Sequence, residues 1–224
     1  MKLKSLQTCF LGLGLAVATG QVLAASCVSG SLSSYVSLGS TGCSNDALTF
    51  SNFVVDTFPG PTAQQIDPAA LSINPLSNGI SLLSSSAISA SQGQLFGFRL
   101  TFDVAGSSLT GGAVAFGPDR SASGDGVLTA LLDAGSAGNA IAIAIDGFED
   151  TPASFTSVAS GKYAAFLELG VDGGTVGAAS LGPDLVALTF AGGTGVTPVP
   201  EPATVALTLA GLAALYVRRR ALQS

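Results

Sequence analysis

The chain has 224 residues, of which 47% are hydrophobic and 10% are charged, a length that fits one large all-β domain or two small ones. The apolar fraction is too high, and the net charge of −6 too small, for a disordered chain. Because the sequence contains no His, catalytic triads, Cys–His pairs and His-bearing zinc sites are excluded. The pI of about 4.3 argues against nucleic acid as a partner, because phosphates call for Lys and Arg.

Residues 1–25 have the order of features of a secretory signal peptide. Lys2 and Lys4 form a basic start, residues 9–17 (CFLGLGLAV) are apolar, and small residues at Ala24 or Ala25 supply a cleavage site. We therefore expect export by Sec-type machinery and cleavage by signal peptidase. The alternatives are a buried N-terminal core helix and a lipoprotein signal ending at Cys27. A lipoprotein signal usually places Leu three residues before the Cys, and Leu23 is one position too far back.

The C-terminal segment has three parts in a fixed order. Residues 195–202 are a Pro-containing linker, which Pro keeps extended. Residues 203–217 (ATVALTLAGLAALYV) carry no charge, and Arg218, Arg219 and Arg220 follow at once. An apolar run stopped by Arg is typical of a membrane segment with a cytoplasmic basic flank. The sequence therefore predicts a transmembrane helix over 203–217 and a basic cytoplasmic tail over 218–224, although about 20 residues are usual for a full span.

Val199, Pro200, Glu201 and Pro202, with the apolar run and the Arg cluster behind them, resemble the PEP-CTERM sorting signal of exported proteins of diderm bacteria. The resemblance covers about the last 25 residues. It implies that a separate membrane enzyme, exosortase, recognises the Pro-Glu-Pro tripeptide and processes the tail. It also implies delivery to the envelope or extracellular matrix, with exopolysaccharide as a partner there. The short apolar run departs from the pattern, and an ordinary single-span anchor after a Pro-rich linker is the alternative.

Residues 26–194 are predicted to form one antiparallel β-sandwich or jelly-roll-like ectodomain. It is distinctly acidic, since three basic and thirteen acidic residues lie between Ser26 and Pro200. The clearest strand covers 96–104, where Phe and Leu alternate with Arg, Thr and Asp. Further strands are expected at 32–38, 48–55 (with a bulge), 80–83, 113–116, 127–132, 141–145, 163–171 and 185–190. Glycine-rich turn signals separate these runs at 111–112, 117–119, 124–126, 146–147, 172–174 and 182–184.

Two cysteines, Cys27 and Cys43, remain once the signal peptide is removed. Outside the cytoplasm two such thiols are expected to pair. Closing a loop of this length is worth ~3 kcal/mol in the chain-entropy model. The sequence therefore predicts one disulfide near the N-terminus of the mature chain, with two unpaired thiols as the alternative.

Five acidic residues in loops are the candidates for chemistry: Asp119, Asp125, Asp146, Glu149 and Asp150. Acidic loops can bind Ca²⁺, which takes six to eight oxygen ligands, and paired carboxylates can cleave glycosides. However, residues 119–125 lack the alternating acids and distal Glu of an EF-hand loop, and Asp is an ordinary turn residue. These positions are weak metal candidates and weaker catalytic ones.

Other features leave alternatives open. Lys162 is the single Lys after signal removal, so a Ser–Lys dyad is formally possible, but a solvated Lys at a strand edge is the simpler interpretation. The Ser-rich run at 81–91 is compatible with glycosylation or with a closely packed strand. The chain has no Trp, which weakens a lectin that stacks sugar rings on aromatic side chains.

These features predict a non-enzymatic protein with no cofactor. We expect an inner-membrane-anchored precursor with a periplasmic ectodomain, which then moves to the cell surface or matrix as a structural or adhesive component. The alternative is a Ca²⁺- or glycan-binding module on the same scaffold. A carboxylate-based hydrolase is a third possibility, and it requires two acids ~5–10 Å apart across a cleft.

Overall fold

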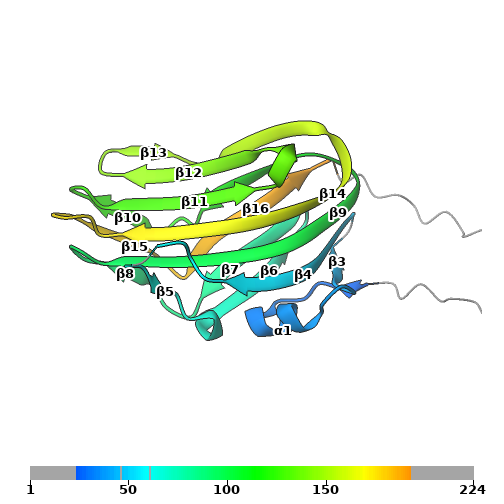
Figure 1. Cartoon of the computed structure of the whole chain (residues 1–224), viewed down its shortest axis with the longest axis horizontal. Coiled ribbons are helices and arrows are strands. Elements are labelled where there is room, and N and C mark those ends of the chain that lie inside the picture. Colours follow the sequence, from blue (N-terminus) through cyan, green and yellow to red (C-terminus); the bar gives the residue numbers. More distant parts are fainter. Residues whose placement is uncertain (1–23, 46, 61, 193–224) are drawn as a thin grey trace, which may run out of the picture.

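The computed structural model describes residues 24–45, 47–60 and 62–192, and these residues form a predominantly antiparallel all-β fold (Figure 1). One α-helix, α1 (Leu32–Ser37), and two short 3₁₀ turns, η1 (Pro68–Ala70) and η2 (Gly135–Ala137), accompany the strands in the part described. In chain order the strands are β1 (Ala25–Ser26), β2 (Gly30–Ser31), β3 (Cys43–Asn45), β4 (Leu48–Asp56), β5 (Gln64–Gln65), β6 (Leu71–Leu76), β7 (Gly79–Ser84), β8 (Ile88–Ala90), β9 (Leu95–Phe116), β10 (Arg120–Ser123), β11 (Val127–Asp133), β12 (Asn139–Ile145), β13 (Phe148–Asp150), β14 (Ala153–Asp172), β15 (Ala178–Leu181) and β16 (Asp184–Ala191).

The two layers of the fold are joined through the long strands β9 and β14, which bend and contribute one half to each layer (Figure 1). The first half of β9 pairs with β4 and with the second half of β14, and β11, β12 and β13 continue that layer. The second half of β9 pairs with β16, and β7, β6 and β2 follow. Both layers therefore belong to one hydrogen-bonded sheet, although the register of β9 and β14 shifts at the bend between Thr156 and Lys162. The strands β10, β15 and β8 form a separate small sheet.

The molecule has two unlike ends. We call the "corner end" the bends of β9 and β14 (residues 106–108 and 157–161) together with η2 and Gly192. We call the "hairpin end" the opposite end, where residues 117–119, 124–126, 146–147, 173–177 and 182–183 connect the strands. Both described chain termini leave near the corner end, on the right in Figure 1.

Most of the predicted strands are confirmed. The run at 96–104 forms the first half of β9, with Phe98, Leu100, Phe102 and Val104 buried. The strands expected near 48–55, 80–83, 127–132, 141–145, 163–171 and 185–190 are also present, and the bulge falls in β4 between Ser51 and Val54. Period-two burial holds in these segments because each strand has one face against the core.

Two local predictions are wrong. The segment 32–38 is not a strand: α1 begins there, because Ser31 caps it by accepting a hydrogen bond from Ser34 N, while Leu32 and Tyr35, three residues apart, bury one helix face. Gly111 and Gly112 are not a turn: they lie inside β9. A Cβ on Gly111 would overlap the Phe155 carbonyl oxygen, so these glycines allow β14 to pass closely.

The core is centred on an aromatic cluster contributed by both layers. Phe53 stacks on Phe102 with ring centroids 5.7 Å apart, and Tyr35 of α1 meets Phe53 edge-on at 5.3 Å. Phe190 of β16 approaches from the other layer, 6.1 Å from Phe50. Such pairs add about 0.5–1.5 kcal/mol each beyond their burial. The cluster therefore holds α1 and the two layers together.

The orientation of β12 could not be read from the alternation of Ile and Ala. The Ala side chains at 140, 142 and 144 enter the core, whereas Ile141 on the opposite face is 46% exposed. Phe148 on the neighbouring β13 is 54% exposed. The outer face of this edge of the sheet is therefore apolar, unlike the polar outer face usual for an antiparallel layer.

The predicted disulfide between Cys27 and Cys43 is present, with Cα atoms 4.9 Å apart. Ala25 and Ser26 pair in parallel with β3, and Cys27 N donates to the Ser44 carbonyl oxygen at 2.8 Å. The disulfide thus fixes the first described residues against β3, which in turn pairs with β4.

Candidate functional site

Asp125, the most strongly bonded acidic candidate, joins two connections at the hairpin end. One carboxylate oxygen accepts from the Thr175 hydroxyl at 2.5 Å and the Thr175 backbone N–H at 2.8 Å. The other oxygen accepts from Val176 N at 2.8 Å. The Thr175 hydroxyl, followed by the backbone N–H groups of Val176 and Thr175, lowers the pKa of Asp125 to about 2. This carboxylate therefore stabilises the β14–β15 loop.

Two further acidic candidates also bond to the loops around them. Glu149 forms an ion pair with Arg120 at 2.6 Å, and Arg120 also donates to the Gly117 carbonyl oxygen at 2.9 Å. Asp146 accepts a hydrogen bond from Gly124 N at 3.3 Å. The carboxylates thus tie neighbouring turns to one another.

Asp119 and Asp150 complete the predicted set. Both are exposed, and Asp150 lies on β13 opposite Ile143. The structure places the five residues at one end of the molecule but gives Asp125, Asp146 and Glu149 separate partners. Within the described residues, no group of three or more His, Cys, Asp and Glu side chains is arranged to hold a metal ion.

Lys162 lies in the middle portion of β14, next to the bend. Its Nζ is 2.8 Å from an Asp103 carboxylate oxygen, which also accepts from Asn52 Nδ2 at 2.6 Å. Partial burial raises the pKa of Asp103, but the hydrogen bonds from Lys162 and Asn52 outweigh it, so the pKa falls below its ordinary value. Asn52 adopts a positive φ of 54° at the β4 bulge. A bulge changes the direction in which a side chain points. The Asp103 carboxylate of β9 is thereby linked to Asn52 of β4 and to Lys162 of β14.

This arrangement disfavours a Ser–Lys dyad. A nucleophile-activating Lys must lose its proton, usually through desolvation, whereas the Lys162 side chain is 57% exposed and paired with a carboxylate. The nearby Ser160 hydroxyl donates to the Lys162 carbonyl oxygen at 3.0 Å. Ser160 therefore bonds to the backbone at the bend.

A cavity of about 470 Å³ opens at the corner end between η2 and the bend of β14. Small and hydroxyl-bearing residues dominate its lining, which includes Ser136, Ser157, Ser160 and Lys162 and contains no acidic residue. Tyr163 also borders it, with its hydroxyl hydrogen-bonded to Ser157 Oγ. The cavity is polar and open, and it lies beside the ion pair of Lys162 with Asp103.

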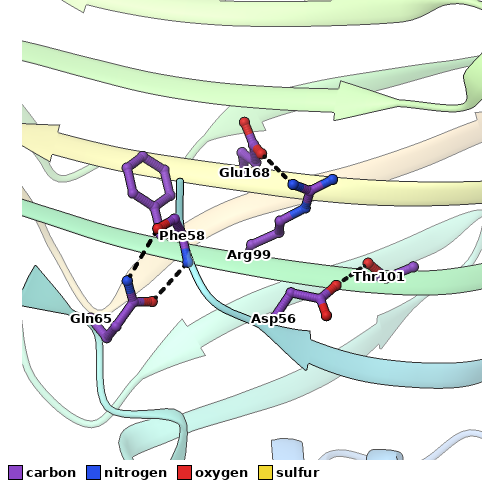
Figure 2. A network of polar contacts seen from close by, with 6 residues as sticks. All are labelled: Asp56, Phe58, Gln65, Arg99, Thr101 and Glu168. Carbon is purple, nitrogen blue, oxygen red and sulfur yellow. Dashed lines mark hydrogen bonds and ion pairs between the residues drawn. The ribbon is translucent and has the colours of Figure 1, made fainter. Parts of the chain in front are cut away.

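A second polar network covers the outer face of β4, β9 and β14 (Figure 2). Arg99 pairs with Glu168 at 3.2 Å across the two central strands, and its guanidinium lies 4.3 Å from the centre of the Phe166 ring. Gln65 accepts from Phe58 N at 3.0 Å and donates to the Phe58 carbonyl oxygen at 3.4 Å. The Phe58 ring lies against Gly97, where a Cβ would overlap it. This network fastens the segment after β4 onto the sheet.

The sorting residues Val199, Pro200, Glu201 and Pro202, the apolar run 203–217 and Arg218, Arg219 and Arg220 lie outside the described residues. The same is true of the signal peptide up to Leu23. Among the residues that are described, no helix is long and apolar enough to cross a membrane. These predictions therefore stay predictions.

The sequence pointed to the candidate residues but not to their hydrogen-bond partners. Thr175, which binds Asp125, and Asn52, which binds Asp103, were not singled out, although the expected bulge near 48–55 was a signal for Asn52. In each pair the two residues lie about 50 positions apart in the chain. Only the strand register brings them together.

Comparison of the chain with protein-family models, with curated proteins and with solved structures found no match.

Proposed function

We propose that this protein is an exported structural or adhesive component of the cell envelope or extracellular matrix, sorted by a PEP-CTERM-type C-terminal signal. The observation that carries the proposal is the order Pro200-Glu201-Pro202, uncharged run 203–217 and Arg218 to 220 at the end of a chain that begins with a secretory signal pattern. In this proposal Glu201 and its flanking prolines are recognised by an exosortase-like membrane enzyme. The Arg cluster keeps the tail oriented until it is processed.

The described fold supports this proposal in two respects. Its strands run from Ala25, the last residue of the assigned signal peptide, to Ala191, so the folded region otherwise lies between the two segments that we assign to export and sorting. The disulfide of Cys27 with Cys43 is suited to an oxidising compartment. A disulfide at the new N-terminus restrains a segment that would otherwise fray after signal cleavage.

A structural or adhesive role agrees with what the charged side chains do. Asp125, Glu149 and Lys162 are bonded to neighbouring turns and strands. A Ca²⁺ site would have to compete with these bonds. The glycan-binding alternative, with exopolysaccharide as the ligand, rests on the family resemblance.

The proposal is tested by the intact mass of the protein from cells and from medium, with Glu201→Gln as the decisive variant. In its native host, the wild-type chain is expected to begin near Ser26 and to end near Pro202, with two hydrogens lost to the disulfide. If the enzyme recognises the Glu201 charge, E201Q keeps signal cleavage but retains the Arg-rich end.

Pro198→Ala is the matched control, because it changes a proline of the linker outside the Pro-Glu-Pro tripeptide. P198A is expected to be processed like the wild type. Retention of the Arg-rich end by the wild-type protein would instead indicate an ordinary membrane anchor, and acyl chains on Cys27 would indicate a lipoprotein.

A further inference from the structure

We infer that, while the tail is embedded, the corner end of the domain faces an anionic lipid bilayer and Val158 lies at the point of closest approach. The inference rests on the proposed membrane insertion of residues 203–217. It adds which surface of the domain meets the membrane, and with what chemistry.

The position of Gly192 provides the first argument. Gly192 follows β16 and lies against the backbone of Ser108 in the bend of β9, where a Cβ would overlap the Ser108 carbonyl oxygen. The ten residues 193–202 that separate Gly192 from the apolar run span at most about 36 Å even when fully extended. The membrane segment therefore starts within this distance of the corner end.

The dimensions of the sheet provide the second argument. The first half of β9, residues 95–105, runs from the hairpin end to the bend, and eleven residues of strand extend about 36 Å. When the strands point toward the membrane, the hairpin end thus lies about 36 Å farther away than the corner end. The ten-residue linker could bring the hairpin end to the membrane only if all of its residues were fully extended along the sheet.

Charge provides the third argument, because the acidic residues concentrate at the hairpin end. The strand register and the loop contacts place seven of them at or next to that end: Asp119, Asp125, Asp146, Glu149, Asp150, Asp172 and Asp184. Arg120 is the one basic residue that the described residues place among them. An anionic leaflet repels such a surface within a Debye length of about 8 Å.

The corner end carries fewer carboxylates among the described residues: Asp133 beside η2, and Asp103, which is paired with Lys162. Val158 at the bend of β14 is 90% exposed, and Ala159 beside it is also exposed. The adjoining cavity is lined by hydroxyl groups and Lys162, without a carboxylate. An apolar tip beside hydroxyl groups and an ion-paired Lys is compatible with the headgroup region, where an apolar side chain enters and a Lys stays at the polar level.

The experiment uses intrinsic fluorescence, because the natural chain has no Trp. Single-Trp variants Val158→Trp and Val176→Trp are made in the full chain carrying E201Q, so that the tail is retained. Val176 is the matched control, since it is also a Val, is 76% exposed and lies at the hairpin end. Vesicles contain phosphatidylethanolamine and phosphatidylglycerol, with or without brominated acyl chains.

We expect V158W emission to shift to the blue on vesicle binding and to lose intensity with brominated lipid, while V176W is unchanged. Ala159→Trp provides a second probe of the bend if V158W does not fold. Equal or greater quenching of V176W would overturn the inference. A third variant, Phe148→Trp, detects a domain that lies on the apolar outer face of β12 and β13, and strong quenching there would also overturn it.

Vesicle flotation separates the two levels of the argument. A protein that does not float with vesicles contradicts the proposed membrane insertion of the tail, and with it this inference. A protein that floats while neither V158W nor A159W is quenched leaves tail insertion intact and overturns the orientation alone.

Discussion

The corner end and the hairpin end are stabilised by different means, although the same long strands connect them. At the corner end, β9 and β14 pass from one layer to the other with shifts in their register, and the disulfide fixes the nearby N-terminal segment. At the hairpin end, separate turns meet, and carboxylates such as Asp125 bond to them from the side. The disulfide is thus near the corner end, whereas the turns of the hairpin end are joined by hydrogen bonds to carboxylates.

This difference predicts that the two ends respond to different conditions. A disulfide is insensitive to acid but is lost under reducing conditions. Carboxylate hydrogen bonds are insensitive to reduction but are lost when the carboxylate is protonated. Reduction is therefore expected to loosen the corner end first, and acid the hairpin end first.

The largest effect is expected from removing the disulfide. The double variant Cys27→Ser, Cys43→Ser should lose ~3 kcal/mol of unfolding free energy, the value of a loop of this length in the chain-entropy model. The melting temperature should fall by about 6–12 °C for a domain of this size. Urea unfolding of the tail-less domain measures the change.

Reduction of the wild-type domain is the control for that experiment. If the disulfide alone is responsible, the reduced wild type and the double variant should unfold at the same urea concentration. Equal stability of the oxidised wild type and the double variant would show that β1 and β3 hold the N-terminal segment without covalent help.

The strands with a buried face could be predicted from the sequence because a single physical rule acts on them. In the first half of β9, Phe98, Leu100 and Phe102 must face the core, so Arg99 and Thr101 must face outward. The disulfide was predictable for a similar reason, since Cys27 and Cys43 were the two thiols left to pair.

Other features depend on information that a local pattern does not contain. In β12, Ile and Ala alternate with equal regularity, and only the space inside the sandwich decides that Ala142 is buried and Ile141 is exposed. At 32–38 the helix is too short for a helical period to be recognised. Gly112 resembles a turn residue in its local sequence. In the structure it lies inside β9, where the absence of a side chain leaves room for the Phe155 ring of β14.

For the candidate site, the sequence predicted which types of residue are present but not which contacts they make. Acidic loops were evident, but the sequence could not show that Asp125 binds Thr175 or that Lys162 binds Asp103, because both contacts depend on strand register. The bend that bounds the cavity at the corner end was missed for the same reason. It divides β14, of which only the second half had been predicted.

The second largest effect is expected at the hairpin end, from Asp125→Asn. The pKa of Asp125 is about 2 in the folded protein, below its ordinary value of 3.8. The folded state therefore binds the proton less readily than the unfolded state. The stabilisation by Asp125 is complete above pH 4 and is lost as the pH falls toward 2.

Measurement of unfolding free energy against pH tests this sign. D125N should lower stability near pH 7 and flatten the decline between pH 4 and pH 2. Asp150→Asn is the matched control, because Asp150 is an exposed acid at the same end and its side chain makes no hydrogen bond within the described residues. If D150N flattened the decline as much as D125N, the hydrogen bonds from Thr175 and Val176 would not be the cause.

The smallest effect is expected beside the bend, from Lys162→Met. This change keeps most of the aliphatic length of the side chain but removes the ammonium from Asp103, whose side chain is 15% exposed while that of Lys162 is 57% exposed. An ion pair with one solvated partner contributes about 0.5–1 kcal/mol and weakens in salt. Asn52 still donates to the same Asp103 oxygen in the variant, so the carboxylate keeps a partner. K162M should therefore lose about 0.5 kcal/mol of unfolding free energy in low salt and almost nothing in high salt.

The double variant K162M, Asn52→Ala should lose more unfolding free energy than the two single variants together. The reason is that the double variant alone leaves Asp103 without either donor. Additive losses would show that the three side chains do not act as one cluster.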